Sequence, residues 1–458
     1  MMNRKVSRNM GPDFIWGVST SSYQIEGAAR EDGRGPSIWD TFCRQGRISN
    51  GDTGDIACDH YHRYMEDVVL MRDLGVDAYR FSVSWPRVLP EGRGAPNEHG
   101  LAFYDRLIDA LLAAGIEPWL CLYHWDLPQA LHDRGGWTAR ESAAWFADYS
   151  ALVARRYGDR VKRFATFNEP SVFSLLGYGF GTHAPGVCSR DALLKVIHNV
   201  NRAHGAAVDN IRSAVAGASI GAVHNYQQCF PASDTAGDRA AAQLFQQYWN
   251  NAFPDPQLLG RYPPLLAEGI ADLQAPDDLA AIRRPVDWFG LNHYSPLYIK
   301  SDAGGVLGCG FAAPPPELPR TCIGWPIQPD AFRDTLLTVG WRYGLPIYVL
   351  ENGTATNDRV LASGEVPDPD RIAYLRDYIG AMREAIAAGA DVRGYFVWSL
   401  LDNFEWTAGY SQRFGLVHID YASLRRTPKA SARWYAELIR ADRQQVVAGN
   451  TAARDGRA

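Results

Sequence analysis

The amino-acid sequence predicts an α/β protein built as a single closed (β/α)8 (TIM) barrel. Short apolar segments alternate with longer helical patterns along most of the chain, which is typical of βαβ units and a parallel sheet. Eight such apolar segments occur, and eight parallel strands close into a barrel. The open doubly wound alternative is disfavoured, because no G-x-G-x-x-G follows the first strand and no G-x-x-x-x-G-K-[ST] occurs.

The predicted strands are short apolar or alternating segments separated by amphipathic helices. In chain order the strands cover residues 14–20, 77–85, 116–125, 161–167, 218–224, 286–292, 346–352 and 392–400. The clearest helical patterns cover residues 61–75, 101–115, 141–156, 191–213, 236–250, 330–342 and 370–388. In the first of these helices apolar residues recur every three or four positions, and Gly75 follows as a C-terminal stop.

We expect one catalytic domain over residues 13–440, although 458 residues would by length alone allow about three domains. No segment has the composition of an interdomain linker. Residues 1–12 and 441–458 are expected to be frayed ends. The longest irregular stretch, residues 301–329, is rich in Gly and Pro, and we expect it to be an extended βα loop on the C-terminal rim.

Composition and charge exclude several classes of partner. The net charge is −5 and the densest basic stretch, residues 425–433, is best explained as a solvated face, so no nucleic-acid partner is expected. No apolar run approaches the roughly 18 residues of a membrane span, and no signal peptide is found. Seven widely spaced cysteines without C-x-x-C favour reduced thiols and a cytoplasmic location. No H-E-x-x-H occurs, and we expect neither a metal nor another cofactor.

Two predicted strands end on a glutamate. Glu169 lies in "NEP" just after the fourth strand, and Glu351 lies in "ENG" at the end of the seventh. In a barrel both would reach the C-terminal rim, where active sites are built. Two carboxylates facing one cavity suit glycoside hydrolysis, which needs a proton donor and a base or nucleophile. Either tripeptide alone could equally be a polar turn before the next helix.

Other predicted strand ends carry groups that can bind a polyhydroxylated ring. Amides, an imidazole and a further carboxylate supply hydrogen-bond donors and acceptors for hydroxyls, and indoles can stack on the apolar face of a sugar. These candidates are Gln24, His124, Trp125, Asn292, Tyr294, Trp398, Glu405 and Trp406. Each Trp considered alone is more simply a packing residue.

The chain resembles glycoside hydrolase family 1, the β-glucosidase family, over residues 11–440. The resemblance rests on seven motifs in family order: "SYQIEG", "YRFSVSW", "YHWDLP", "TFNEP", "NHY", "ENG" and "NFEW". It implies a retaining β-glycosidase, first of all a β-glucosidase that hydrolyses cellobiose, short oligosaccharides and aryl or alkyl glucosides by double displacement. The partners implied are small-molecule β-glucosides, and the oligomeric state is left open.

The resemblance also implies roles for individual residues. Glu169 matches the acid/base and Glu351 the nucleophile, with Arg80 and Tyr294 holding Glu351 as an anion. Asn168 matches the residue that binds the sugar 2-hydroxyl, while Trp398 and Trp325 match the sugar and leaving-group platforms. The other substrate-binding positions are Gln24, His124, Trp125, Asn292, Glu405 and Trp406, and His183 in "GTHAPG" matches a rim histidine. The chemistry needs a raised pKa for Glu169 and an ionised Glu351.

Two alternative functions and two departures from the family pattern follow from the sequence. A 6-phospho-β-glycosidase would need cations near the sugar 6-position, where the sequence has Glu405 and Gln412 and only Arg413 as a cation. A non-catalytic sugar-binding barrel would be expected to lack one of the two glutamates. Ser171 follows "NEP" where many relatives have an aromatic residue, and Pro326 follows Trp325, so we expect a wider leaving-group region.

Overall fold

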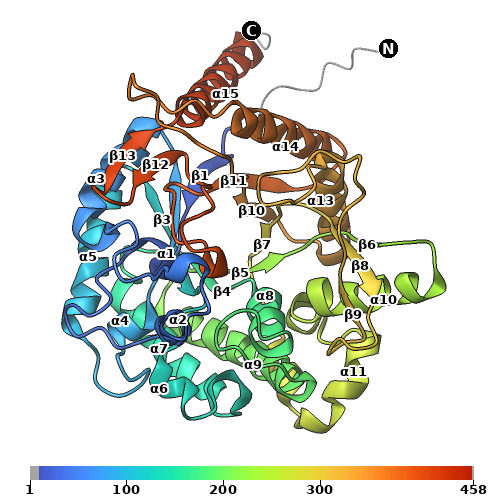
Figure 1. Ribbon diagram of the computed structural model, residues 1–458. Helices are drawn as coiled ribbons and strands as arrows, with labels where there is room; N and C mark the ends of the chain where they lie inside the picture. Colours follow the sequence, from blue (N-terminus) through green and yellow to red (C-terminus); the bar gives the residue numbers. More distant parts are fainter. Residues whose placement is uncertain (1–9, 456–458) are drawn as a thin grey trace.

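A closed barrel of eight parallel strands forms the centre of the computed structural model, which describes residues 10–455, with side chains described to residue 445 (Figure 1). Around the barrel the strand order is β1-β11-β10-β7-β5-β4-β3-β2. The strands are β1 (Ile15–Ser19), β2 (Ala78–Ser82), β3 (Glu117–Tyr123), β4 (Arg163–Asn168), β5 (Ser219–Asn225), β7 (Trp288–Asn292), β10 (Ile347–Asn352) and β11 (Val392–Trp398). Each coincides with one of the eight predicted strands, so the predicted fold is confirmed.

Helices surround the barrel on the outside (Figure 1). The long ones are α3 (His60–Leu74), α5 (Glu98–Ala113), α7 (Ser142–Tyr157), α9 (Arg190–Ala214), α10 (Ala236–Gln246), α13 (Pro329–Tyr343), α14 (Pro369–Ala387) and α15 (Ala430–Asp455). Gly75 ends α3 with φ of 75°, a left-handed conformation that glycine adopts without steric cost. The predicted helix over 236–250 is shorter, because α10 ends at Gln246 and a π turn over Gln247–Asn251 follows.

Short elements decorate the loops after the strands. The short helices are α1 (Ser22–Ile25), α2 (Ile38–Arg44), α4 (Trp85–Val88), α6 (Gln129–His132), α8 (Pro170–Ser174), α11 (Pro264–Ile270) and α12 (Asp278–Ile282). A three-stranded sheet is formed by β6 (Cys229–Pro231), β8 (Leu297–Ser301) and β9 (Cys309–Phe311), and a hairpin by β12 (Val417–Asp420) and β13 (Arg425–Pro428). The predicted loop over 301–329 is therefore irregular except at its start, where β9 pairs antiparallel with β8.

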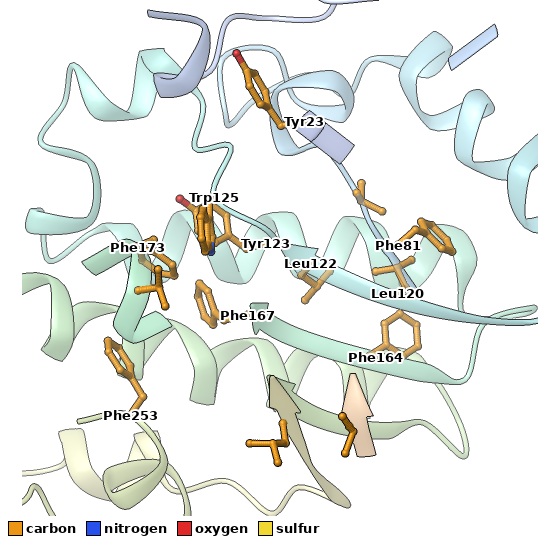
Figure 2. Packing of buried hydrophobic residues seen from close by; sticks show 14 of the residues in the cluster. Tyr23, Phe81, Leu120, Leu122, Tyr123, Trp125, Phe164, Phe167, Phe173 and Phe253 are labelled. Carbon is orange, nitrogen blue, oxygen red and sulfur yellow. The ribbon is translucent and has the colours of Figure 1, made fainter. Parts of the chain in front are cut away.

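Two layers of apolar side chains hold the barrel. Between strands and helices, Phe164, Phe167, Leu120 and Leu122 belong to one continuous core that extends toward Phe173 (Figure 2). Inside the barrel a separate cluster fills the half nearer the N-terminal ends of the strands, and Trp119 has Trp288, Tyr348 and Phe396 around it with ring centroids 4.8–5.4 Å away. Because this cluster closes the interior from below, a cavity can open only at the C-terminal rim.

The chain ends differ from the expected frayed segments. Helix α15 continues through residues 441–455, and the Asp442 carboxylate is buried, where it accepts hydrogen bonds from the Met10 amide (3.3 Å) and Trp16 Nε1 (3.2 Å). The expected boundary at residue 440 therefore lies inside α15. Asp442 on this helix holds both Met10 and Trp16 of β1 in place. The expectations for residues 1–9 and 456–458 lie outside the described residues.

Two further properties bear on the expected partners. The seven cysteines are free thiols. Among the helices of residues 10–455, none is both long and apolar enough to cross a membrane. Within the same residues, no group of three or more His, Cys, Asp or Glu side chains is arranged to hold a metal ion.

Candidate active site

A cavity of about 480 Å³ opens at the C-terminal rim of the barrel. Eleven of the predicted site residues line it: His124, Trp125, Glu169, His183, Asn292, Tyr294, Trp325, Glu351, Trp398, Glu405 and Trp406. The other three, Gln24, Arg80 and Asn168, are buried directly behind the lining and hydrogen-bond to residues in it. The structure thus brings these fourteen residues together at one cavity.

Strand β4 ends abruptly at the cavity, which explains the run of amide, carboxylate and proline in "NEP". Glu169 adopts φ of 48°, a left-handed conformation, and Pro170 follows as the first residue of α8. Trp125 and Trp406 also have positive φ, at 81° and 49°. Such conformations cost about 1–3 kcal/mol each for residues other than glycine and are concentrated at functional sites. Three residues that line this cavity therefore have a strained backbone.

A steric constraint explains why the last residue of "ENG" is a glycine. A Cβ on Gly353 would lie 1.9 Å from the backbone oxygen of Trp398, so no other residue fits there without moving β11. This contact places the end of β11, which carries Trp398, against the end of β10, which carries Glu351.

Glu351 is held by two strong donors. Arg80 donates to its Oε1 at 2.5 Å, and the Tyr294 hydroxyl donates to its Oε2 at 2.6 Å. The second amino group of Arg80 donates to Asn168 Oδ1 at 2.5 Å. Both Arg80 and Glu351 are almost completely buried, so this ion pair lies in a medium of low dielectric constant, where a charged hydrogen bond is strong.

Glu169 has a weaker set of partners. Its Oε1 accepts from Asn292 Nδ2 at 3.0 Å, and the same amide donates to Asn168 Oδ1 at 3.0 Å. No cation among the described residues forms an ion pair with Glu169. Burial and the negative charge of Glu351 raise the pKa of Glu169 to about 8.

The two carboxyls therefore differ in proton affinity. Burial also raises the pKa of Glu351 above its ordinary value, which the sequence did not indicate, but Arg80 and Tyr294 oppose that rise. Since only Glu351 has a guanidinium beside it, Glu351 loses its proton before Glu169 does.

A polar and aromatic cradle occupies the arc of the barrel formed by β11, β1 and β3. Gln24 Nε2 donates to Glu405 at 3.3 Å, and burial together with Glu351 raises the pKa of Glu405 to about 8. Asn168 donates to His124 Nε2 at 3.0 Å, while His124 Nδ1 is buried without a protein partner. Burial lowers the pKa of His124 well below its usual range, so the ring is neutral. It stacks near Trp398 and Trp406, each at 5.8 Å between centroids.

The opposite wall of the cavity is mostly apolar, and sequence reasoning found little of it. Only Trp325 and Pro326 were singled out beforehand. Additional apolar lining comes from Val172, Leu176, Trp249, Leu297 and Phe311. Their positions follow strands β4, β5 and β7, but no sequence motif marks them.

The expectation of a wider leaving-group region at Ser171 stays a prediction. Ser171 is buried on α8 but does not line the cavity, whereas its neighbour Val172 does. Successive helical residues point about 100° apart, so a one-residue step takes a side chain off the cavity wall. Ser171 itself therefore contributes no surface to the leaving-group region.

A barrel closed at the bottom, two buried carboxyls in unequal environments and a sugar-sized cradle of amides and indoles define a glycoside hydrolase. Residues 6–444 match the model of glycosyl hydrolase family 1, and the chain belongs to that family.

Known glucosidases are similar to this chain over nearly its full length. β-Glucosidase A of Thermotoga maritima is 45% identical over 433 residues, which cover 93% of this chain and 97% of the relative. A bifunctional β-D-glucosidase/β-D-fucosidase of Bifidobacterium breve is 44% identical, with 93% and 97% covered. The solved structure of the Thermotoga maritima β-glucosidase in complex with glucoimidazole superimposes with a TM-score of 0.90 at 44% identity, covering 95% of this chain and all of that chain.

Proposed function

We propose that this protein is a retaining β-glucosidase in which Glu351 is the nucleophile and Glu169 the acid/base. The observation that carries the proposal is that two buried carboxyls in one cavity have different hydrogen-bond partners. Glu351 receives a guanidinium and a phenol, while Glu169 receives only an amide. A nucleophile must be an anion and a general acid must hold its proton near neutral pH, and these environments favour that assignment.

The reaction then proceeds in two displacements. The Glu351 carboxylate attacks the anomeric carbon as the bond to the leaving oxygen breaks, and Glu169 gives that oxygen its proton. The product of this step is a glycosyl ester of Glu351. Glu169, now ionised, takes a proton from water as the water attacks the anomeric carbon and releases Glu351. Retention of configuration requires the two carboxyls to lie about 5–5.5 Å apart, and Asn292 is a shared neighbour of both.

The polar and aromatic cradle suits a glucosyl ring. Gln24 and Glu405, which hydrogen-bond to each other, offer a donor and an acceptor to sugar hydroxyls. The neutral His124 offers its unpaired Nδ1, and Asn168 lies between Arg80 and Asn292, where it can meet the 2-hydroxyl. Trp398 and Trp406 supply apolar faces for stacking, and Trp125 packs against Trp406 with centroids 4.4 Å apart.

The apolar wall suits aryl and alkyl leaving groups as well as a second sugar. The relatives named as β-glucosidases support glucosides as substrates, and the bifunctional relative supports β-fucosides as a side activity. Small-molecule β-glucosides are thus the proposed partners. The free thiols are in keeping with a cytoplasmic location.

The two alternatives are less well supported. Arg413, the cation that a 6-phosphate would need, donates to Asp402 at 2.7 Å and to the Ile419 backbone oxygen at 3.0 Å, and it does not line the cavity. Glu405 offers no positive charge with which to bind a phosphate. A non-catalytic barrel would have no need of the ion pair that holds Glu351.

A substrate panel with product analysis tests the proposal. We expect hydrolysis of 4-nitrophenyl β-glucoside and cellobiose, weaker hydrolysis of the β-fucoside and β-galactoside, and little of the glucoside 6-phosphate. Proton NMR at early times should show the β-anomer of glucose as the first product. Preference for the 6-phosphate, or α-glucose as the first product, would overturn the assignment.

A further inference from the structure

Glu405 is placed in the cavity mainly by the shape of its backbone turn. Among the described residues, the one hydrogen bond to its carboxyl comes from Gln24 Nε2, and at 3.3 Å it is long. Residues 405–409, which we call the rim turn, close on themselves. The Glu405 amide donates to the Gly409 backbone oxygen at 2.7 Å, and the Gly409 amide donates to the Trp406 backbone oxygen at 3.1 Å. The first four residues of the rim turn line the cavity, so its position sets the position of Glu405.

The rim turn has a strained backbone that its surroundings must hold. Trp406 has φ of 49°, and Gly409 has φ of 58° with ψ of −133°. Such conformations persist only where the surrounding structure fixes them. At the start of the turn, the Trp406 ring packs against Trp39 and Trp125 with centroids 4.6 and 4.4 Å apart. At the end of the turn Gly409 has no side chain, so another part of the chain must fix it.

Asp52 fixes the end of the rim turn from outside the cavity. It belongs to the loop between α2 and α3, and its Oδ2 accepts a hydrogen bond from the Tyr410 amide at 2.9 Å. A Cβ on Gly409 would lie 2.2 Å from the same oxygen, so the carboxylate lies directly against the turn. The Tyr410 hydroxyl donates to the Thr53 backbone oxygen at 2.6 Å, which is a second link between the two loops. Asp52 itself does not line the cavity, so it can influence a substrate only through the rim turn.

We propose that Asp52 is a positioning residue that makes the site selective for glucosides. By fixing the rim turn, Asp52 holds the Glu405 carboxyl where a hydroxyl of the glucosyl ring can meet it. The inference rests on the proposed function. A site built to hydrogen-bond a hydroxyl discriminates against sugars in which that hydroxyl is missing or inverted, and a displaced Glu405 loses this discrimination. If Asp52 only stabilised a surface loop, its loss would affect every sugar alike.

Kinetics of Asp52→Ala with two sugars on one leaving group test the proposal. For 4-nitrophenyl β-glucoside we expect kcat/KM to fall about three- to tenfold, the loss of one hydrogen bond. For 4-nitrophenyl β-fucoside, which lacks the 6-hydroxyl and has the 4-hydroxyl inverted, we expect a fall of less than about twofold on the same scale. Asp52→Asn keeps an acceptor for the Tyr410 amide and should retain the wild-type ratio of the two substrates. The matched control is Asp77→Ala, because the half-buried Asp77 also accepts a backbone amide, that of Trp16 at 2.9 Å, but just before β2 at the opposite end of the barrel. It should leave the ratio unchanged.

A double-mutant cycle shows whether Asp52 acts through Glu405. In a Glu405→Gln background, Asp52→Ala should change kcat/KM for the glucoside by less than about twofold, because two residues that act through one contact are not additive. Full additivity of the two substitutions, or equal losses for glucoside and fucoside in folded Asp52→Ala, would overturn the role of Asp52. If the wild type hydrolysed neither glycoside, the proposed function itself would fail.

Discussion

Replacing Tyr294 with phenylalanine should shift the acidic limb of the pH profile without disturbing the fold. The hydroxyl donates to Glu351 Oε2 at 2.6 Å, while the ring packs near Trp325 and Phe414 at 5.4 and 6.0 Å between centroids. The substitution keeps the ring and removes the donor. A hydrogen bond to a charged group contributes about 1.5–3 kcal/mol, and one pKa unit corresponds to about 1.36 kcal/mol. The pKa of Glu351 should therefore rise by about one to two units.

The direction follows from which form the donor favours. Tyr294 stabilises the carboxylate, so its removal makes Glu351 hold its proton to higher pH. The activity carried by ionised Glu351 should then begin about one to two units higher in the profile of kcat/KM for 4-nitrophenyl β-glucoside, although the apparent values belong to the coupled pair.

Tyr378→Phe is the matched control for this experiment. The Tyr378 hydroxyl donates to the Tyr294 backbone oxygen at 3.0 Å and does not contact the carboxylate. The acidic limb should stay in place in this variant. An unmoved limb in folded Tyr294→Phe, or an equal shift in Tyr378→Phe, would refute the reasoning.

Three more substitutions test other parts of the structure. Glu169→Ala should flatten the basic limb of the pH–rate profile. It should slow hydrolysis of cellobiose far more than that of dinitrophenyl β-glucoside, because the dinitrophenolate leaves without a proton. Equal losses in kcat/KM for the two substrates would contradict the acid/base role. Glu169→Gln should make the protein more stable than the wild type, by a margin that grows as pH rises from about 5 to about 8. The reason is that the raised pKa of Glu169 contributes stability only while the group is protonated. Melting temperatures of both proteins at both pH values check this, and a difference in melting temperature that does not change with pH would count against it. Lys429 is fully buried between Asp358 and Asp402, so Lys429→Met should lower the free energy of unfolding by about 3–5 kcal/mol, and a loss below about 1 kcal/mol in urea titrations would show that the pair is not critical.

The barrel was predictable because its strands are short apolar segments between helices with clear stop signals. The smaller sheet was not, since β6 and β9 have three residues each and such segments carry no measurable periodicity. Helix α15 was not predicted, and residues 441–458 were expected to be frayed because their polar composition resembles a tail; only the tertiary contacts of Asp442 show that the helix is anchored.

The catalytic half of the site was predictable for a similar local reason. Glu169 and Glu351 stand at the ends of buried strands, where the fold alone directs side chains to the rim. The leaving-group wall depends on which way side chains point from short loops and helices, so the sequence did not show that Val172 rather than Ser171 lines the cavity.

The most direct test of the account is to trap the covalent intermediate. A 2-deoxy-2-fluoro-β-glucoside with a good leaving group should inactivate the protein, since the fluorine slows both displacements while the leaving group preserves the first. Mass spectrometry of the digested protein should then place one fluoroglucosyl group on Glu351. Labelling of Glu169 or of Glu405, or inactivation without a covalent adduct, would contradict the assignment of Glu351 as the nucleophile.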